Sequence, residues 1–125
     1  MSIREKIKRT ATEAIENEYS SINRLLSAIN DEFADAVELI YNSKGRVIVT
    51  GIGKSAIIAH KIVATLNSTG TPAIFMHAAD AIHGDIGIVR KEDIIIALSK
   101  SGETPEVKIL VPLLKARQNT LIALV

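Results

Sequence analysis

The chain has no cysteine, few aromatic residues and almost no excess charge, and each absence excludes a class of protein. Without cysteine there can be no disulfide and no thiolate metal site, which is compatible with a cytoplasmic location. A net charge of +1 and an aromatic content of 3% offer little to hold or stack nucleic acid. No apolar run approaches the roughly 20 residues of a membrane helix, and the charged N-terminus lacks the apolar region of a signal peptide.

The composition that remains is that of a globular chain. Of the 125 residues, 47% are apolar and 23% are charged, which is too apolar for a disordered chain and suits one soluble domain. Because aromatic residues are scarce, the core must be built from Ile, Val, Leu and Ala, the residues typical of helices packed on a parallel sheet.

Residues 3–42 are predicted to be helical. Ser2 and Glu5 fit a capping box, Asn30–Asp31 fits a break with a second N-cap, and Lys44–Gly45 fits the helix stop. Apolar residues spaced by three and four form one stripe on this helix, namely Ile15, Tyr19, Ile22, Leu26, Ile29, Phe33, Ala36 and Ile40. The stripe exceeds what packing on one sheet requires, so we expect part of it to contact another subunit in a homo-oligomer.

After residue 44, short β-branched runs alternate with helical patterns. We expect strands at 47–50, 73–76, 93–98 and 120–125, helices at 54–68 and 104–117, and a loop or short helix at 77–87. This alternation predicts an α/β fold with a parallel β-sheet flanked by helices on both faces.

The chain is therefore divided into an N-terminal helical segment, residues 1–44, and an α/β domain, residues 45–125. It ends in the apolar run 121–125, which we interpret as a strand cut from a larger protein. On this interpretation the α/β domain is incomplete at its C-terminus.

Three polar segments follow three of the predicted strands, where open parallel sheets bind ligands. The first, Gly51–Ser55, combines glycines that permit close backbone approach with the cation of Lys54 and a helix N-terminus that favours an anion. An ordinary strand-to-helix turn is the alternative. A P-loop is excluded because Ile48 stands where its first glycine belongs, and a dinucleotide site is disfavoured because no acid ends the second strand near His77.

The segment Ser99–Thr104 is a sharper signal than the first. Three hydroxyls, on Ser99, Ser101 and Thr104, lie with Gly102 between a buried strand and a helix, where all three can donate to phosphate oxygens. An N-cap needs only one hydroxyl, so three favour ligand binding over a simple cap.

The remaining candidates are two histidines and a glutamate. His77 and His83 lie near the expected ligand edge, which fits either catalysis or a metal, although their spacing matches no recognised zinc motif. Glu106 lies one turn into the last helix and fits an acid/base group, or a carboxylate that favours the positive helix end. The spacing alone leaves these alternatives open.

These residues resemble the SIS (sugar isomerase) domain, and within it the arabinose 5-phosphate isomerases. The resemblance runs from about Gly45 to Lys115 and is carried by four motifs: Val-Thr-Gly-Ile-Gly-Lys-Ser at 49–55, Ser-Thr-Gly-Thr-Pro at 68–72, Ala-Ile-His-Gly-Asp at 81–85 and Ser-Lys-Ser-Gly-Glu-Thr at 99–104. It implies a flavodoxin-like, three-layer α/β/α fold. It also implies a homotetramer that interconverts D-arabinose 5-phosphate and D-ribulose 5-phosphate, feeding lipopolysaccharide biosynthesis, with no organic cofactor.

The resemblance also assigns roles to particular positions. Substrate-binding positions fall on Gly53, Ser55, His77, Ser99, Ser101, Gly102 and Thr104. Catalytic positions fall on Lys54, His83 and Glu106, with Glu106 as candidate base, Lys54 stabilising an oxyanion, and His83 opening the sugar ring, shuttling a proton or positioning the substrate. His77 is the residue that would join an inhibitory divalent metal site.

The family pattern continues beyond residue 125, where it has a further catalytic carboxylate, a late histidine and two CBS modules. We therefore expect isomerase activity from the longer parent protein and none from these 125 residues alone. A sugar-phosphate-sensing SIS module of a regulator is the main alternative, and a SIS isomerase for a hexulose or heptose phosphate is another. The joint presence of Lys54, His83 and Glu106 favours an enzyme, because a sensor needs only the hydroxyls.

Overall fold

The computed structural model describes all 125 residues, which form two compact units, Met1–Val37 and Glu38–Val125. The division into residues 1–44 and 45–125 expected from the sequence stays a prediction. None of the helices is both long and apolar enough to cross a membrane.

The N-terminal unit begins with the long helix α1 (Ile3–Arg24). The predicted capping box is confirmed: the backbone N–H of Glu5 donates to Ser2 Oγ over 3.2 Å, and the N–H of Ser2 donates to the Glu5 carboxylate over 2.6 Å. These two bonds satisfy donors that a helix N-terminus otherwise leaves free. A 3₁₀ turn, η1 (Leu25–Ala28), follows α1 directly.

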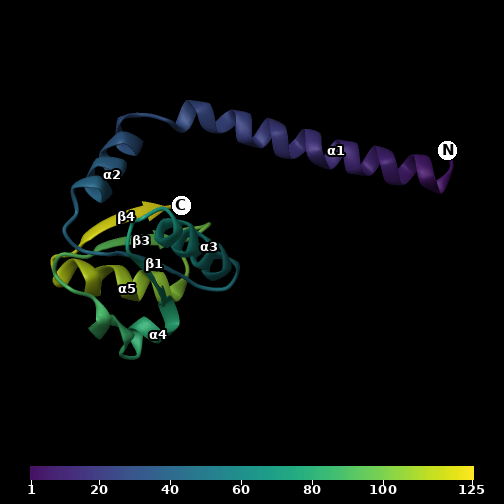
Figure 1. Ribbon diagram of the computed structural model, residues 1–125. Coiled ribbons are helices and arrows are strands. Elements are labelled where there is room, and N and C mark those ends of the chain that lie inside the picture. The colour runs from purple at the N-terminus through teal and green to yellow at the C-terminus, as the bar shows by residue number, and fades with distance from the viewer. The chain divides into compact units, whose positions relative to one another are not determined.

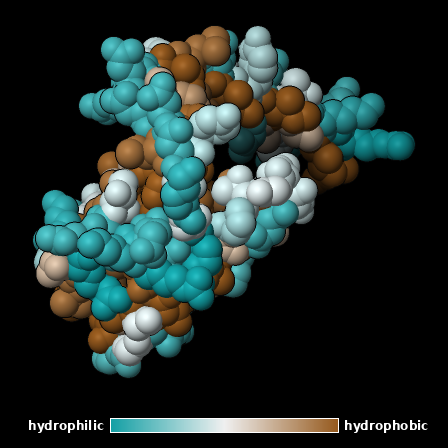
Figure 2. Space-filling view, turned by 60° about the vertical axis from the view of Figure 1, so that its left-hand side comes forward, coloured by the Kyte–Doolittle hydropathy of each residue, from teal (hydrophilic) through white to brown (hydrophobic).

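The helical segment breaks earlier than the sequence predicts. α1 ends at Arg24, and the second helix, α2 (Asp31–Asn42), begins after the 3₁₀ turn. Asn30 does act as the second N-cap, because its Oδ1 accepts the N–H of Phe33 over 3.1 Å. Neither helix contains a buried residue, and Figure 2 shows hydrophobic side chains exposed at the surface among hydrophilic ones.

The second unit is built on a parallel sheet of β1 (Val47–Gly51), β2 (Ala73–His77), β3 (Ile94–Leu98) and β4 (Thr120–Leu124). The strand order is β2-β1-β3-β4 (Figure 1). The two central strands, β1 and β3, are buried along their whole length, which explains why both are continuous apolar runs in the sequence.

Helices cover both faces of this sheet. α3 (Lys54–Ser68) packs on one face against a core that includes Val47, Val49 and Ile96. The other face is covered by the short helix α4 (Ala78–Ile82) and by α5 (Pro105–Ala116), around Ile48 and Ile95. A 3₁₀ turn, η2 (Asp85–Ile88), connects α4 towards β3. The predicted three-layer α/β/α fold with a parallel sheet is thus confirmed.

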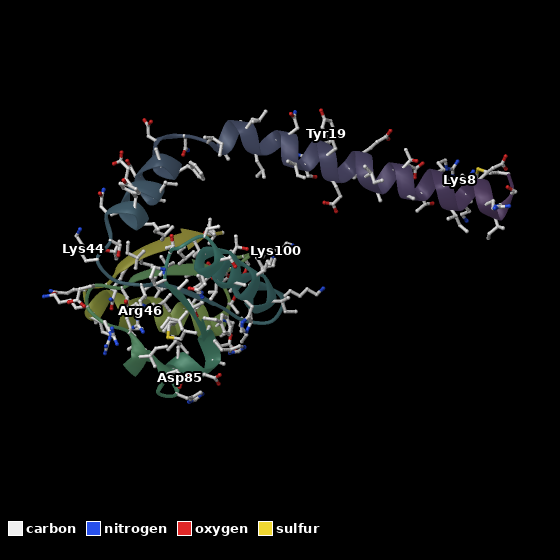
Figure 3. The ribbon with its side chains drawn as sticks, viewed as in Figure 1. Lys8, Tyr19, Lys44, Arg46, Asp85 and Lys100 are labelled. Atoms are coloured by element: carbon white, nitrogen blue, oxygen red, sulfur yellow. The ribbon has the colours of Figure 1, made fainter.

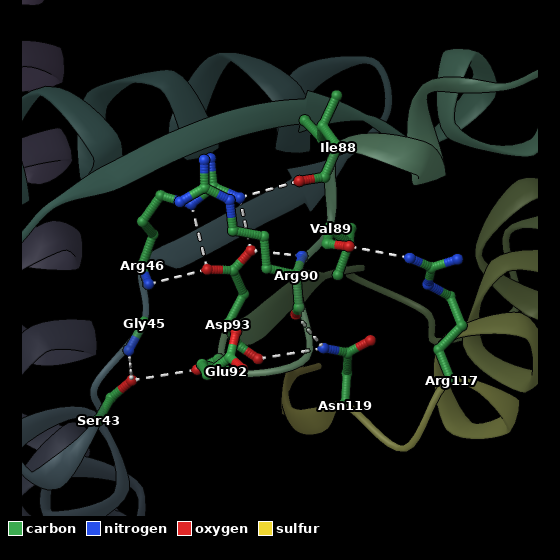
Figure 4. A network of polar contacts seen from close by, with 10 residues as sticks. All are labelled: Ser43, Gly45, Arg46, Ile88, Val89, Arg90, Glu92, Asp93, Arg117 and Asn119. Atoms are coloured by element: carbon green, nitrogen blue, oxygen red, sulfur yellow. Dashed lines mark hydrogen bonds and ion pairs between the residues drawn. The ribbon is translucent and has the colours of Figure 1, made fainter.

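An ion pair lies at the amino edge of the sheet, where β1 and β3 begin (Figure 4). Asp93 is 2% exposed and accepts four hydrogen bonds, three from Arg46 and one from the N–H of Arg90, at 2.6–3.1 Å. Burial alone would raise the pKa of Asp93, but the hydrogen bonds from Arg46 and Arg90 outweigh it and hold the pKa below its usual value. The pair therefore fixes the start of β1 against the start of β3.

Two further residues complete this edge. The amide of Asn119, just before β4, donates to the carbonyls of Arg90 at 2.8 Å and Asp93 at 3.3 Å. Gly45 lies so close to Glu92 that a Cβ at position 45 would clash with the Glu92 carbonyl group. The predicted end of the helical segment at residue 42 is confirmed, and Gly45 follows it with a φ that is not positive, so it does not stop the helix through a left-handed conformation. A glycine is required here because the Glu92 backbone leaves no space for a side chain at position 45.

We predict that replacing Asp93 with asparagine destabilises the fold by about 3 kcal/mol at neutral pH, because Arg46 then lacks its counter-charge. Since the folded pKa of Asp93 lies below its ordinary value of 3.8, its contribution is complete above that value and is lost as the pH falls through the folded pKa. Urea unfolding at a series of pH values measures both effects. A variant as stable as the original chain at neutral pH would contradict the assignment, and exposed Glu92→Gln is the control.

Candidate functional site

The strand order creates a switch point between β1 and β3. The connection from β1 runs through α3 to β2 on one side, whereas the connection from β3 runs through α5 to β4 on the other side. Because the helices depart in opposite directions, the carboxyl ends of β1 and β3 leave a crevice of the kind that binds ligands in open α/β sheets. Figure 3 shows Lys100, which follows β3, at the opposite end of this unit from Arg46.

The turn from β1 into α3 is drawn tightly against β3. A Cβ on Gly51 would lie 3.2 Å from Ser55 Cβ and 3.3 Å from the Leu98 carbonyl oxygen, so glycine is needed for this approach. Gly53 has a φ of 59°, which other residues rarely adopt, and it forms the N-cap of α3. The turn thus brings Ser55 to the end of β3.

The loop after β3 is organised by its own hydroxyls. Ser99 is 4% exposed, and its Oγ accepts the N–H of Gly102 over 3.0 Å and lies 3.0 Å from Thr104 Oγ1. Ser101 Oγ, at the surface, accepts the N–H of Glu103 over 3.1 Å. In this structure the hydroxyls of Ser99 and Ser101 therefore hold the loop in shape, and their role as phosphate ligands stays a prediction.

Both helices at the switch point begin without a side-chain cap. The N-cap of α3 is Gly53, which has no side chain, and the N-cap of α5 is Thr104, whose hydroxyl bonds with Ser99 and does not cap the helix. The first backbone N–H groups of a helix lack partners within the helix and carry a partial positive charge. Two such termini, following neighbouring strands, form a favourable environment for an anion.

A hollow of about 300 Å³ connects the two loops. It is lined on the polar side by Ser55, Ser99 and Lys100 and on the apolar side by Ile58, Leu98, Leu124 and Val125. The structure therefore brings the predicted segments Gly51–Ser55 and Ser99–Thr104 together at one cavity. Lys54, His77, His83, Ser101, Thr104 and Glu106 do not line it.

His77, at the end of β2, lies beside the first loop, because it pairs in register with Gly51. Its Nδ1 accepts the N–H of Ala79 over 3.2 Å, and its ring lies edge-on to Phe75 with centroids 6.1 Å apart. Because Nδ1 is occupied by this bond, it is not available to another partner. The nitrogen left for a ligand is therefore Nε2.

The three predicted catalytic residues lie on three different elements. Lys54 is the exposed first residue of α3, and Glu106 is half-buried in the first turn of α5. His83 is exposed at the C-terminal end of α4, which packs against α5. None of these side chains makes a hydrogen bond or ion pair within the chain, so each has its polar atoms available to a ligand.

The residues of this chain do not form a metal site. No group of three or more His, Cys, Asp or Glu side chains comes together in the structure, and His77 offers one nitrogen. The predicted role of His77 as a metal ligand would therefore need ligands from outside these residues.

Sequence reasoning missed two residues at this edge. Lys100 lines the hollow and adds a cation beside the loop hydroxyls, and its place inside the Ser-rich segment was an available signal. Thr50 is fully buried at the end of β1, and its hydroxyl has no hydrogen-bond partner. Its side chain lies on the face of Ile48, beneath α4 and α5. Threonine is common in strands, so the sequence does not indicate that this hydroxyl lacks a hydrogen-bond partner.

Comparisons with known proteins agree with this geometry. The family model described as SIS domain matches residues 39–125. Arabinose 5-phosphate isomerase KdsD of Pseudomonas aeruginosa is 47% identical over 115 residues, which cover 92% of this chain and 35% of the relative. The protein of the same description from Yersinia pestis is 40% identical over 117 residues, covering 94% of this chain and 36% of the relative. This chain thus spans about a third of the length of these relatives.

A solved structure gives the same result. An E. coli CFT073 protein in complex with arabinose 5-phosphate superposes with a TM-score of 0.90 at 38% identity, covering 98% of this chain and 65% of that protein. The agreement extends over both the α/β domain and the N-terminal helices, because it includes nearly the whole chain.

We predict that Thr50→Val leaves the fold intact and raises the free energy of unfolding by about 1–3 kcal/mol, the cost of a buried polar group without a partner. Valine has nearly the same shape and brings no hydroxyl to desolvate. Chemical denaturation of the two proteins measures the difference. A loss of stability would show instead that the Thr50 hydroxyl is hydrogen-bonded, and Thr120→Val, at an exposed position, controls for β propensity.

Proposed function

Because this chain belongs to the SIS domain family, we propose that the protein carrying it is a sugar-phosphate isomerase that interconverts D-arabinose 5-phosphate and D-ribulose 5-phosphate. The observation that carries the proposal is the match to arabinose 5-phosphate isomerases, at 47% identity over 92% of the chain. The geometry supports it, since two uncapped helix N-termini and the hydroxyl of Ser55 converge on one edge of the sheet.

The phosphate of the substrate is the group that this edge suits best. A phosphate offers three acceptor oxygens and about two negative charges, which favour hydroxyl donors, backbone N–H groups and helix N-termini. In the proposal, Ser55, Ser101 and Thr104 donate to these oxygens, with the backbone of Gly53 and Gly102 close by. Ser99 shapes the loop through its bonds to Gly102 and Thr104.

The chemistry is a proton transfer between two neighbouring carbons. With arabinose 5-phosphate in its open form, a base removes the proton from C2 while the C1 oxygen gains a proton, which gives an enediol. A proton then returns to C1 and the C2 hydroxyl loses one, which gives the ketose. No electron leaves the substrate, so we propose that no organic cofactor takes part.

We assign the groups as the sequence suggests. Glu106 is the base, because its carboxylate is half-buried in the first turn of α5 and makes no ion pair within the chain, so it remains available to the substrate. Lys54 stabilises the oxyanion that develops at the carbonyl oxygen. His83 opens the sugar ring, shuttles a proton or positions the substrate, and the nearby His77 presents Nε2 to the ligand.

The wider setting is proposed on the same basis. The protein would act in the cytoplasm as a homo-oligomer, a tetramer by resemblance, and feed lipopolysaccharide biosynthesis. The exposed apolar residues of α1 and α2 support assembly, because they have no partner within their own unit.

The test is an assay of the full-length protein that carries this chain, with D-arabinose 5-phosphate as substrate. We expect ketose formation, and a loss of at least about 100-fold in kcat/KM for Lys54→Ala and for Glu106→Gln, the usual contribution of acid–base groups. Lys61→Ala, exposed on the same helix as Lys54, and Glu92→Gln, at the opposite edge of the sheet, are the matched controls.

The outcomes separate the alternatives. Binding of the sugar phosphate without turnover would indicate the sensor module in place of the isomerase. Turnover of a hexulose or heptose phosphate, but not of D-arabinose 5-phosphate, would support the isomerase reaction and contradict the proposed substrate. Unchanged kcat/KM in both Lys54→Ala and Glu106→Gln would remove the catalytic assignment.

A further inference from the structure

Helix α1 presents an apolar row with no partner. Its 22 residues include none that is buried. Ile3, Ile7, Ile15 and Tyr19 are 76%, 63%, 70% and 71% exposed, and with Ala11 they are spaced four residues apart. Residues at this spacing form one ridge along a helix, which is the kind of ridge that packs against another helix.

The charges along α1 are segregated by sign. The first half carries Arg4, Lys6, Lys8 and Arg9 against one acid, Glu5, whereas the following turns carry Glu13, Glu16 and Glu18 with no cation before Arg24. One ion pair forms within the helix, between Arg9 and Glu13 at 3.4 Å. Arg4, Lys6, Glu16 and Glu18 make no ion pair, so their charges are available to a partner (Figure 3 shows the side chains that extend from this helix).

The sequence of α1 is complementary to itself when it is read backwards through Ala11. The ridge residues are matched in pairs equally far from Ala11, namely Ile3 with Tyr19 and Ile7 with Ile15. Arg4 and Glu18, also equally far from Ala11, carry opposite charges and lie about 20° from it around the helix axis, so they flank the same ridge. The residue at the centre, Ala11, is small enough for two helix backbones to approach closely.

We propose that α1 binds α1 of a second copy of this chain in antiparallel orientation, with the two-fold axis passing at Ala11. In such a symmetric interface each contact occurs twice, so every cation that meets an anion does so on both sides of the axis. A parallel pair would place Arg4 on Arg4 and Glu18 on Glu18 and would be repulsive. The contact from residue 3 to residue 19 spans about 24 Å of helix.

This pairing goes beyond the proposed isomerase activity and does not depend on it, although it rests on the homo-oligomer proposed with that function. It specifies which helix contacts which, in what orientation and in what register, whereas the isomerase proposal concerns the edge of the sheet in the other unit. The pairing and the isomerase activity can therefore fail separately, because the cross-linking experiments below use no substrate.

Disulfide formation tests the orientation. The chain has no cysteine, so a single introduced cysteine gives an unambiguous cross-link. We expect a mixture of full-length proteins bearing Ile7→Cys and Ile15→Cys to form the mixed disulfide dimer at least about tenfold faster than either variant alone under mild oxidation. Ala11→Cys should link to itself, and Ser20→Cys, half a turn away from Ala11 around the helix axis, is the unreactive control.

Faster self-linking of each single variant than of the mixture would overturn the antiparallel orientation in favour of a parallel one. A protein that is monomeric in light scattering and forms no cross-link at any of the ridge positions would show that α1 is covered by its own chain, which also overturns the proposal.

Charge reversal tests the register. We expect Arg4→Glu, added to both cysteine variants, to slow formation of the mixed disulfide by roughly threefold at low salt, because two attractive contacts with Glu18 become repulsive. Adding Glu18→Lys to the same chains restores the rate, because the pair at positions 4 and 18 is again of opposite sign. A rate that stays low in the chains with both charges reversed would contradict the pairing.

Discussion

β1 and β3 pair in parallel from Val47 and Ile94 to Thr50 and Ala97, and the candidate site depends on this pairing. Because the two strands run in the same direction, their following loops meet at one edge. Because their crossover helices lie on opposite faces, neither helix fills the space between those loops. The close approach of Gly51 to the Leu98 carbonyl then fixes how near the two loops lie. Hydroxyls separated by more than forty residues in the sequence are thereby brought to one cavity.

The two edges of the sheet satisfy their polar groups in different ways. At the amino edge, the carboxylate of Asp93 accepts four hydrogen bonds, and Asn119 and Arg46 bond to backbone carbonyls, so the network is closed within the chain. At the carboxyl edge, two helix N-termini have no side-chain cap. A closed network stabilises the fold, whereas free donors need an external acceptor. This difference makes the carboxyl edge the better candidate for a ligand, on grounds independent of any relative.

The order and type of the elements could be predicted from the sequence, because the spacing of apolar residues and the positions of glycines depend on local structure. Helix α3 has the bounds that the sequence predicts, Lys54–Ser68, since Gly53 and Gly70 enclose a helical pattern. The partners of Asp93 and the orphaned hydroxyl of Thr50 could not be predicted, because both depend on contacts between residues far apart in the chain. The role of Gly45 escapes prediction for the same reason: a neighbouring backbone, and not its own φ, requires a glycine there. For Ser99, its position after a predicted strand places the hydroxyl at the carboxyl edge of the sheet, but it does not predict the bonds of this hydroxyl to Gly102 and Thr104.

The two units differ in what makes them stable, and this bears on assembly. The α/β unit buries two apolar clusters, one on each face of its sheet, and so carries its own core. Helix α1 buries nothing, and helices in water gain most of their stability from packing an apolar face rather than from intrinsic propensity. Its capping box and its one internal ion pair contribute little against the entropy of ordering 22 residues. Within its own unit, α1 finds no surface that supplies this burial. In the pairing proposed above, a second copy of α1 places apolar residues opposite apolar residues and Arg4 opposite Glu18, which would supply it.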